Sequence, residues 1–452
     1  MAKPRSSKST RSKKSKLPVV VPPSSNRLSK QWRQSLLPYQ REIYSKARGL
    51  DQVALYMEQG TGKTHTTLAL LERWLAEDTN PILVVAPLTA CELIWRPVLD
   101  QLGHPYVLTH PEGLAKLESQ ICKQDWLACV VDEAHQYKNP QSKRSKRLSK
   151  LAFIPRKVIL TGTPLEKDPL DLWAQFRFLK PELLGAKWTD FKAAYLEKCG
   201  FMGYDLRIRE DRMRRYLKAI HPYIFEVRRK DVLDVRSKRV IVRVDMSPDQ
   251  ARVYQELDEQ LIAEYNEGLI TAAMAATKLI KLHQIAGGFV YDDQGETLML
   301  GDAKAQRMLK YLDRKCVVFC RYNSEIEGLH RFLTKRGYPV ALLTGSTPRE
   351  DRPKIVNRFN VSKEQILIAQ IRVGGISLNL QSAARAIFYS LPMSRTDFEQ
   401  ARARLLRYGQ ESFVDFILLL TRDSVDEYVY DLLKSKGRVS DLVFDYFKRK
   451  KK

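Results

Sequence analysis

The feature that most constrains the fold of this chain is the short run Gly60-Thr61-Gly62-Lys63-Thr64. It follows a strand-like apolar segment, residues 53–56, and precedes a helical pattern over residues 66–74. In this setting the glycines let backbone N–H groups wrap a phosphate, and the N-terminus of the helix adds a favourable dipole. Lys63 then neutralises the β- and γ-phosphates, and the Thr64 hydroxyl ligates Mg²⁺. The run therefore predicts an α/β domain that binds a nucleoside triphosphate.

Two acidic residues, Asp132 and Glu133, follow another buried-strand pattern at residues 128–131. Open parallel sheets bind their ligands at the carboxyl ends of the strands, where these two side chains are expected. Asp132 is placed to hold Mg²⁺ through water, and Glu133 to orient and deprotonate the attacking water. A solvated acidic turn is the alternative for an isolated Asp-Glu pair. The upstream phosphate loop favours the catalytic interpretation, because hydrolysis needs both a phosphate cradle and a water-activating carboxylate.

Apolar strand patterns occur in two series, separated by a long and mostly helical region. The first series comprises residues 53–56, 82–86, 128–131 and 157–160, and the second comprises residues 316–320, 341–343, 366–369, 386–389 and 413–420. Short apolar strands that alternate with helices indicate parallel sheets covered on both faces. The expected fold class is α/β, with two parallel-sheet lobes in tandem and helical insertions.

The same patterns predict the domain boundaries. We expect a basic flexible arm (1–30), a first lobe (31–230) with a helical insertion from about residue 166, a hinge with a helical insertion (231–300), a second lobe (301–441) and a basic tail (442–452).

Much of the net charge lies at the two ends of the chain. There are 77 Lys and Arg residues against 52 Asp and Glu, which gives a formal net charge of +25. Residues 1–30 contain nine basic residues and no acidic one, and residues 448–452 are all basic. Such tails suit polyphosphate binding through counterion release or a nuclear address, and solubilising ends are an equal alternative.

Hydropathy and cysteine usage exclude several protein classes. Apolar runs such as residues 416–420 are far shorter than the ~20 residues that span a bilayer, and the N-terminus lacks the apolar region of a secretory signal. The six cysteines are scattered without a CxxC pair, which argues against a disulfide framework or a structural zinc site. We therefore expect no membrane association and an intracellular location: bacterial or host cytoplasm, or the nucleus if the basic tails act as signals.

Over about residues 36–441, the order of these motifs resembles superfamily 2 helicase-type ATPases, and within them the Swi/Snf group of double-stranded DNA translocases. The matching segments are LLPYQ at 36–40, GTGKT at 60–64, APL at 86–88, DEAHQYKN at 132–139, LTGTP at 160–164, RRKDV at 228–232, GG at 374–375 with LNL at 378–380, and Q-x3-R-x2-R-x-G-Q at 400–410.

This resemblance implies two RecA-like lobes that hydrolyse ATP, with Mg²⁺, in the cleft between them. Gln40 stands in the place that reads the adenine base, and Gly375 lies in a further ATP-binding motif. Arg404 and Arg407 stand where cationic residues stabilise transition-state charge on the γ-phosphate, and their spacing predicts one shared helix face. The segments that couple the nucleotide to movement contain Thr161, Gly162, Thr163 and Gln400.

The resemblance also implies double-stranded DNA as the partner, and function as a monomer because the arginines come from the same chain. Residues 138–157 contain eight basic residues and no acidic one. Lys138, Lys143 and Arg144 are candidate phosphate contacts, and a solvated helix face is an equal alternative. Two other functions stay open: a strand-separating DNA or RNA helicase, because RNA-acting relatives share DEAH, and a DNA-bound architectural protein with a vestigial ATPase.

Overall fold

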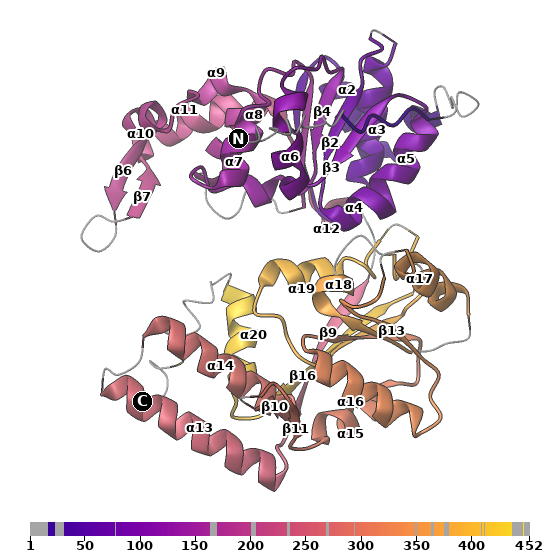
Figure 1. Ribbon diagram of the computed structural model, residues 1–452, viewed down its shortest axis with the longest axis vertical. Helices are drawn as coiled ribbons and strands as arrows, with labels where there is room; N and C mark the ends of the chain where they lie inside the picture. The colour runs from indigo at the N-terminus through magenta and orange to yellow at the C-terminus, as the bar shows by residue number, and fades with distance from the viewer. Residues whose placement is uncertain are drawn as a thin grey trace, which may run out of the picture. The chain divides into compact units, whose positions relative to one another are not determined.

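The computed structural model describes residues 17–22, 31–76, 78–162, 170–199, 205–232, 236–267, 271–292, 294–348, 350–362, 366–374, 379–407, 409–410, 412–435 and 446. The chain forms two compact units (Figure 1). The first comprises Met1–Met57 and Lys63–Glu226, and the second comprises Glu58–Gly62 and Val227–Lys452. This arrangement confirms the predicted α/β class with two sheet-containing lobes in tandem.

The first unit is built on a six-stranded sheet with the order β3-β2-β4-β5-β1-β8. Its strands are β1 (Gln52–Met57), β2 (Ile82–Val85), β3 (Tyr106–Thr109), β4 (Ala128–Val131), β5 (Lys157–Thr161) and β8 (Ile224–Val227). The pairs β1–β5, β4–β5, β2–β4 and β2–β3 are all parallel. Every residue of β2, β4 and β5 is buried, as expected for strands covered on both faces.

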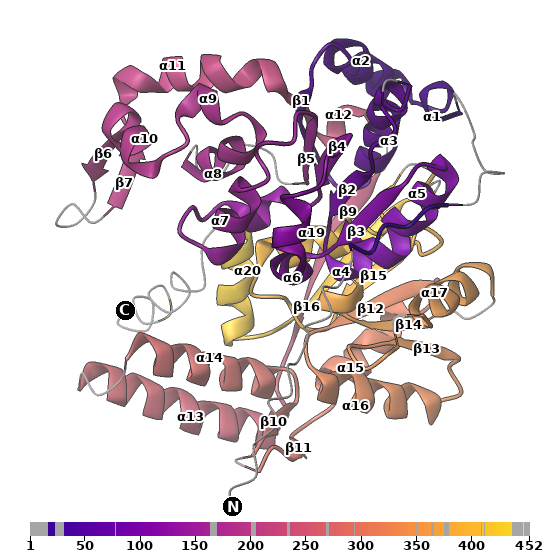
Figure 2. The ribbon, with the colours of Figure 1, turned by 45° about the horizontal axis from the view of Figure 1, so that its top comes forward.

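Helices cover both faces of this sheet (Figures 1 and 2). One face carries α1 (Gln31–Gln34), α2 (Pro38–Ala47), α3 (Lys63–Trp74) and α5 (Arg96–Leu102), and the other carries α6 (Pro111–Ile121), α7 (Lys143–Ser149) and α8 (Leu170–Leu179). The short helix α4 (Leu88–Ala90) and the π-helix η2 (Cys91–Trp95) lead into α5, and the 3₁₀-helix η3 (Ala134–Tyr137) follows β4.

A helical extension of the first unit follows α8. It consists of α9 (Pro181–Leu184), α10 (Trp188–Tyr195), the antiparallel hairpin β6 (Leu196–Cys199) and β7 (Asp205–Ile208), and α11 (Glu210–Ile220). Rings of Trp173, Phe191 and Tyr216 pack in one apolar cluster, with the first two stacked at 5.5 Å between centroids. This aromatic packing joins the extension to the core of the first unit.

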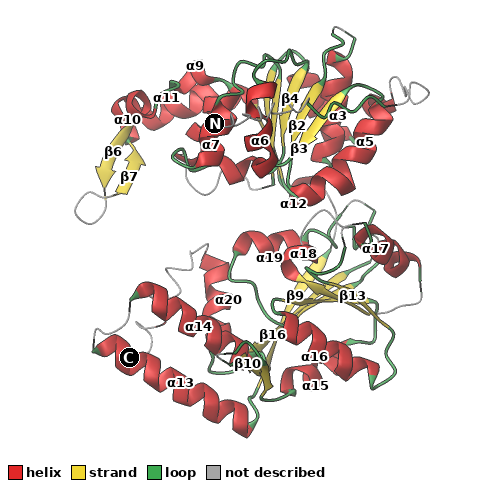
Figure 3. Ribbon diagram, viewed as in Figure 1, coloured by secondary structure: helices red, strands yellow, loops and turns green. Residues whose placement is uncertain are grey.

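The second unit contains a six-stranded parallel sheet with the order β13-β14-β12-β15-β16-β9 (Figure 3). Its strands are β9 (Ser237–Val244), β12 (Cys316–Cys320), β13 (Val340–Leu343), β14 (Ile366–Gln370), β15 (Arg385–Phe388) and β16 (Val414–Thr421). The sequence placed residues 231–300 in a hinge and insertion, whereas β9 is an edge strand of this sheet. Three of its eight residues, Lys238, Arg239 and Arg243, are charged and exposed, so β9 lacks the continuous apolar run of the central strands.

Helices of the second unit are α12 (Arg229–Val232), α13 (Pro248–Asn266), α14 (Ala272–Ala286), α15 (Ala303–Met308), α16 (Asn323–Thr334), α17 (Arg352–Val361), α18 (Ile371–Gly374), α19 (Arg395–Arg402) and α20 (Val425–Ser435). The long pair α13 and α14 precedes the hairpin of β10 (Phe289–Tyr291) and β11 (Thr297–Met299). α13 begins at Pro248 because Ser247 and Gln250 form a reciprocal capping box.

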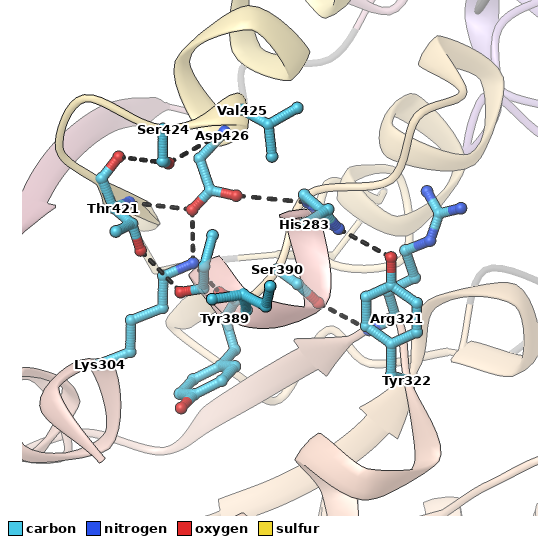
Figure 4. Close-up of polar contacts among 12 residues, drawn as sticks. His283, Lys304, Arg321, Tyr322, Tyr389, Ser390, Thr421, Ser424, Val425 and Asp426 are labelled. Atoms are coloured by element: carbon cyan, nitrogen blue, oxygen red, sulfur yellow. Dashed lines mark hydrogen bonds and ion pairs between the residues drawn. The ribbon is translucent and has the colours of Figure 1, made fainter. Parts of the chain in front are cut away.

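A buried polar cluster connects α14 to the sheet of the second unit (Figure 4). Asp426, on α20, accepts hydrogen bonds from Lys304 Nζ at 2.6 Å and from the Thr421 N–H at 2.9 Å. Its other oxygen lies 3.4 Å from His283 Nε2 on α14, and His283 Nδ1 lies 2.9 Å from the Tyr322 hydroxyl. Burial lowers the pKa of His283 to about 3, so its ring is neutral at neutral pH.

No helix in the described part of the chain is long and apolar enough to cross a membrane. The cysteines at 91, 122, 129, 316 and 320 are free, and Cys316 and Cys320 lie fully buried in β12. Burial raises the pKa of the Cys316 thiol to about 12, which is expected for a cysteine that serves as an apolar core residue.

Candidate functional site

The run 60–64 connects β1 to α3, two elements of the first unit. Gly60 and Gly62 have φ angles of +86° and +77°, in the left-handed region that glycine adopts without strain. α3 begins at Lys63, so the free backbone N–H groups of its first turn lie at this loop. The Lys63 ammonium donates a hydrogen bond to the Met57 carbonyl at 2.9 Å. The loop thus has the backbone conformation and the charge that binding of a phosphate requires.

Asp132 is fixed at the carboxyl end of β4 by three hydrogen bonds. Its N–H donates to the Val85 carbonyl at 2.8 Å, which extends the pairing of β4 with β2. Its Oδ1 accepts from the Glu133 N–H at 2.8 Å, and its Oδ2 accepts from the Trp95 indole N–H at 3.0 Å. Burial raises the pKa of Asp132 to about 6, the neighbouring Glu133 charge adds to the rise, and the Lys63 charge opposes it.

Glu133 occupies a sharp turn in the backbone. Its φ and ψ of 52° and 49° are left-handed, which is uncommon for a residue other than glycine and is found at functional turns. Its Oε2 lies 3.2 Å from Nδ1 of His135, and the two side chains are 17 % and 25 % exposed. The Glu133 side chain is therefore mostly buried and lies beside a neighbouring imidazole.

The sheet order brings these groups to one edge. β1, β5 and β4 are consecutive and parallel, so their carboxyl ends meet at the same edge of the sheet. The phosphate loop follows β1, Asp132 follows β4, and Thr161, 2 % exposed, ends β5 with Gly162 next to it. Thr163 lies outside the described residues.

Oxygen ligands suitable for a hard cation are present at this edge. No group of three or more His, Cys, Asp or Glu side chains within the described ranges could hold a metal ion. Mg²⁺ does not require such a group, because it keeps several waters and takes one or two protein oxygens together with phosphate. The Thr64 hydroxyl and the Asp132 carboxylate therefore fit this ion.

Gln40 lies on α2 and is 4 % exposed. Its Oε1 accepts a hydrogen bond from the Leu37 N–H at 2.9 Å, so the side chain caps the first turn of α2. In the structure this residue therefore shapes the start of a helix, a contribution that the resemblance to an adenine-reading segment did not reveal.

The second unit contains Gln400, Arg404 and Arg407, whereas Gly375 lies outside the described residues. The sequence predicted one helix face for both arginines, and this prediction is wrong. α19 ends at Arg402, and Arg404 and Arg407 follow in a turn. The turn is held by hydrogen bonds from the Leu380 N–H to the Arg404 carbonyl and from the Gln410 N–H to the Arg407 carbonyl, at 3.2 and 3.1 Å.

The basic residues after Asp132 differ in their pairing. Lys138 is exposed beside η3, and Lys143 is exposed at the start of α7. Arg144 forms an ion pair with Glu112 of α6, and Arg147 and Lys150 pair with Glu118 of the same helix. On α7, Lys143 and Lys146 have no ion-pair partner among the described residues. α6 therefore neutralises part of a surface that looked uniformly basic in the sequence.

Two features of the site were missed in the sequence. The Trp95 indole contacts Asp132, and the carboxylates of α6 pair with α7. Both partners lie more than 30 residues away along the chain. The apolar pattern around Trp95 indicated only a core residue, and an acidic residue on α6 gives no local signal of the helix that it faces.

Two family profiles match the chain. An SNF2-related domain matches residues 102–287, and a helicase conserved C-terminal domain matches residues 303–409. The nuclear protein STH1/NPS1 of Saccharomyces cerevisiae is 25 % identical over 440 residues, which cover 84 % of this chain and 32 % of that protein. YwqA of Bacillus subtilis, provisionally named an ATP-dependent helicase/translocase, is 26 % identical over 373 residues, covering 77 % of this chain and 39 % of that protein.

Among solved structures, a SWI2/SNF2 ATPase core of Sulfolobus solfataricus in complex with dsDNA matches with 23 % identity and a TM-score of 0.41, and the match covers 92 % of this chain and 95 % of that one. The chain spans about a third of the length of the two curated relatives that it matches.

Proposed function

Because the chain belongs to the SNF2-related family of helicase-like ATPases, we propose that it hydrolyses ATP to ADP and phosphate in order to translocate along double-stranded DNA. The observation that carries this proposal is the arrangement at the first sheet. A glycine loop at a helix N-terminus, a lysine and a pair of carboxylates all lie at the carboxyl ends of three consecutive parallel strands.

The phosphates bind in the loop of residues 60–64. The first-turn N–H groups of α3 donate to the phosphate oxygens, and Lys63 leaves the Met57 carbonyl to neutralise the β- and γ-phosphates. Thr64 and Asp132 would hold Mg²⁺, and the ion would supply charge neutralisation to the bound phosphates. Gln40 contacts the adenine from the first turn of α2.

Glu133 acts as the general base. It follows Asp132, the proposed metal ligand, directly, and it lies in a left-handed turn at the carboxyl end of β4 with its side chain 17 % exposed. A carboxylate in this place can orient a water for attack on the γ-phosphate and accept its proton. The His135 imidazole has its Nδ1 3.2 Å from Glu133 Oε2, so this neighbouring ring, when protonated, would pair with the base.

The second lobe contributes Arg404 and Arg407. Gln400 of the same lobe, together with Thr161, Gly162 and Thr163 of the first lobe, couples the nucleotide state to movement. An arginine that reaches the transferred phosphoryl group is worth ~10³–10⁵ in rate. This assignment rests on the motif spacing, and it makes a single chain sufficient because both arginines are supplied in cis. Gly375 contacts the nucleotide in the same assignment.

Double-stranded DNA is the proposed partner because the chain resembles the Swi/Snf group through the segments at 228–232 and 400–410. Lys138, Lys143 and Arg144 contact its phosphates in this proposal. The unpaired Lys143 is the strongest of the three contacts, since Arg144 must first leave Glu112.

Steady-state ATP hydrolysis at matched salt, without nucleic acid and with single-stranded DNA, duplex DNA or duplex RNA, tests the proposal. Stimulation by duplex DNA alone is the expected result. Stimulation by single strands or by RNA would replace the translocase with a strand-separating helicase. Absence of turnover under every condition would leave only the architectural role.

A further inference from the structure

We propose that Trp95 is a positioning residue that holds the Asp132 carboxylate in the orientation needed to ligate Mg²⁺. The inference rests on the proposed ATPase function and extends it to a residue outside the motifs that suggested that function. Trp95 is 0 % exposed, and its indole N–H donates to Asp132 Oδ2 at 3.0 Å.

The Asp132 carboxylate is held from both sides. The Glu133 N–H, from the same loop, donates to Oδ1 at 2.8 Å, and the Trp95 N–H, from a different element, donates to Oδ2. One hydrogen bond from the adjacent residue leaves the carboxylate free to turn about its Cα–Cβ and Cβ–Cγ bonds. The second bond, 37 residues away in sequence, removes that freedom.

The backbone is distorted at the point that presents the indole. The segment from Leu88 to Leu102 is helical throughout, but Cys91–Trp95 is the π-helix η2. In it the Arg96 N–H donates to the Cys91 carbonyl, five residues back. Pro97 accounts for the distortion, because its ring clashes with the carbonyl four residues before it in a regular α-helix. The π-helix η2 is held at its start, where Cys91 Sγ lies 3.4 Å from both the Ala86 and the Thr109 carbonyl oxygens.

The chemistry of indole suits this position. Indole is a donor without an acceptor, so it binds a carboxylate and cannot compete for the cation. Each carboxylate oxygen has two lone pairs. Because each Asp132 oxygen accepts one of these hydrogen bonds, its second lone pair stays available to Mg²⁺ or to a water bound to the ion. Partners that orient metal ligands in this way typically contribute 10–100-fold to metal affinity.

The test measures metal binding directly. Mn²⁺ replaces Mg²⁺ as a paramagnetic probe, and electron paramagnetic resonance of free Mn²⁺ gives its affinity for the full-length protein in the presence of ADP. The variant Trp95→Phe removes the N–H donor. A second variant carries β-(3-benzothienyl)alanine at position 95, which replaces the N–H by sulfur and leaves the ring shape nearly unchanged.

A matched control is available in the same unit. Trp126 is also buried, and its indole N–H donates to the Ile121 carbonyl at 2.9 Å, at the opposite end of β4 from Asp132. Trp126→Phe therefore removes an equivalent buried hydrogen bond without touching the carboxylate. Asp132→Asn serves as the reference for loss of the ligand itself.

Both position-95 variants are expected to weaken Mn²⁺ binding by ~10-fold or more, with the metal-free affinity for ADP unchanged and Trp126→Phe equal to the unmodified protein. Unchanged Mn²⁺ affinity in the benzothienyl variant, alongside a large loss in Asp132→Asn, would overturn the role of Trp95 alone. Unchanged affinity in Asp132→Asn as well would overturn the metal assignment in the proposed function. An equal loss in Trp126→Phe would reduce the effect of Trp95 to general destabilisation.

Discussion

Removing the charge of Asp426 should destabilise the second unit severely, because this carboxylate is the acceptor at the centre of a buried polar cluster (Figure 4). In Asp426→Asn, the Lys304 ammonium, 3 % exposed, loses its ion pair at 2.6 Å and retains, among the described residues, a hydrogen bond to the Tyr389 carbonyl at 3.3 Å. Breaking a buried ion pair by removing one partner costs about 3–5 kcal/mol. A domain is stable by about 5–15 kcal/mol, so the variant loses a large part of that margin.

The same chain offers a matched control. Asp351 and Lys354 form an ion pair of similar length, 2.8 Å, in the same unit, but their side chains are 42 % and 74 % exposed. Asp351→Asn removes the same charge from a solvated pair, where water replaces the lost partner. The two variants differ mainly in burial, so their comparison isolates the cost of leaving a cation without its counter-ion in the core.

Two measurements compare the variants: urea denaturation gives the free energy of unfolding, and hydrogen exchange shows which peptides lose protection. With a denaturant slope of about 3 kcal/mol per molar for a unit of this size, the expected loss lowers the midpoint by about 1–2 M. Peptides from α14, β16 and α20 should lose protection, and peptides from β1 and β4 should not, because the cluster lies in the second unit. Equal midpoints for Asp426→Asn and Asp351→Asn would refute the argument that burial determines the cost.

Three further predictions follow from the site and the surface. Lys63→Ala should reduce ATP turnover by at least about 10²-fold, because it removes the charge at the phosphate loop; near-normal turnover would refute the assignment. Below pH 6.5, the free energy of unfolding of the unmodified protein should fall relative to that of His283→Gln by up to about 1.4 kcal/mol per pH unit. The reason is that the folded-state pKa of His283, about 3, lies below its unfolded value, so the unfolded state binds more protons. Chemical denaturation of both proteins at pH 4 to 7 measures the two free energies, and a difference that stays constant with pH would contradict the prediction. Replacing Lys143 and Lys146 by alanine should reduce the slope of the logarithm of DNA affinity against the logarithm of salt concentration by about 2. Arg144→Ala should change this slope less, because the Arg144 guanidinium pairs with Glu112. Equal slopes for the two variants would place the DNA elsewhere.

Much of the fold followed from the sequence because parallel strands carry a strong local signal. The pattern at 316–320 coincides with β12, and the pattern at 128–131 coincides with β4, since fully buried strands are continuous apolar runs. The edge strand β9 did not give such a run, because charged, exposed residues interrupt its apolar ones. The turn that contains Arg404 and Arg407 could not be predicted from their spacing either, because two residues three positions apart can lie in a helix or in a turn.

The limit at the site has the same origin. Residues 60–64 and 132–133 could be proposed from the sequence because their pattern is local: adjacent residues form the loop between β1 and α3, and two adjacent carboxylates follow β4. The contact between Trp95 and Asp132 arises from tertiary packing. It needs β2 beside β4, and it needs the π-helix η2, which directs the indole toward the carboxyl end of β4. Proline at position 97 was visible in the sequence, but its effect on a helix depends on whether the chain breaks, kinks or widens there. Here the helix widens without breaking, and the displaced residue is the one that reaches the carboxylate. A proline within a helix that follows a motif of this kind is therefore a reason to ask which side chain the distortion redirects.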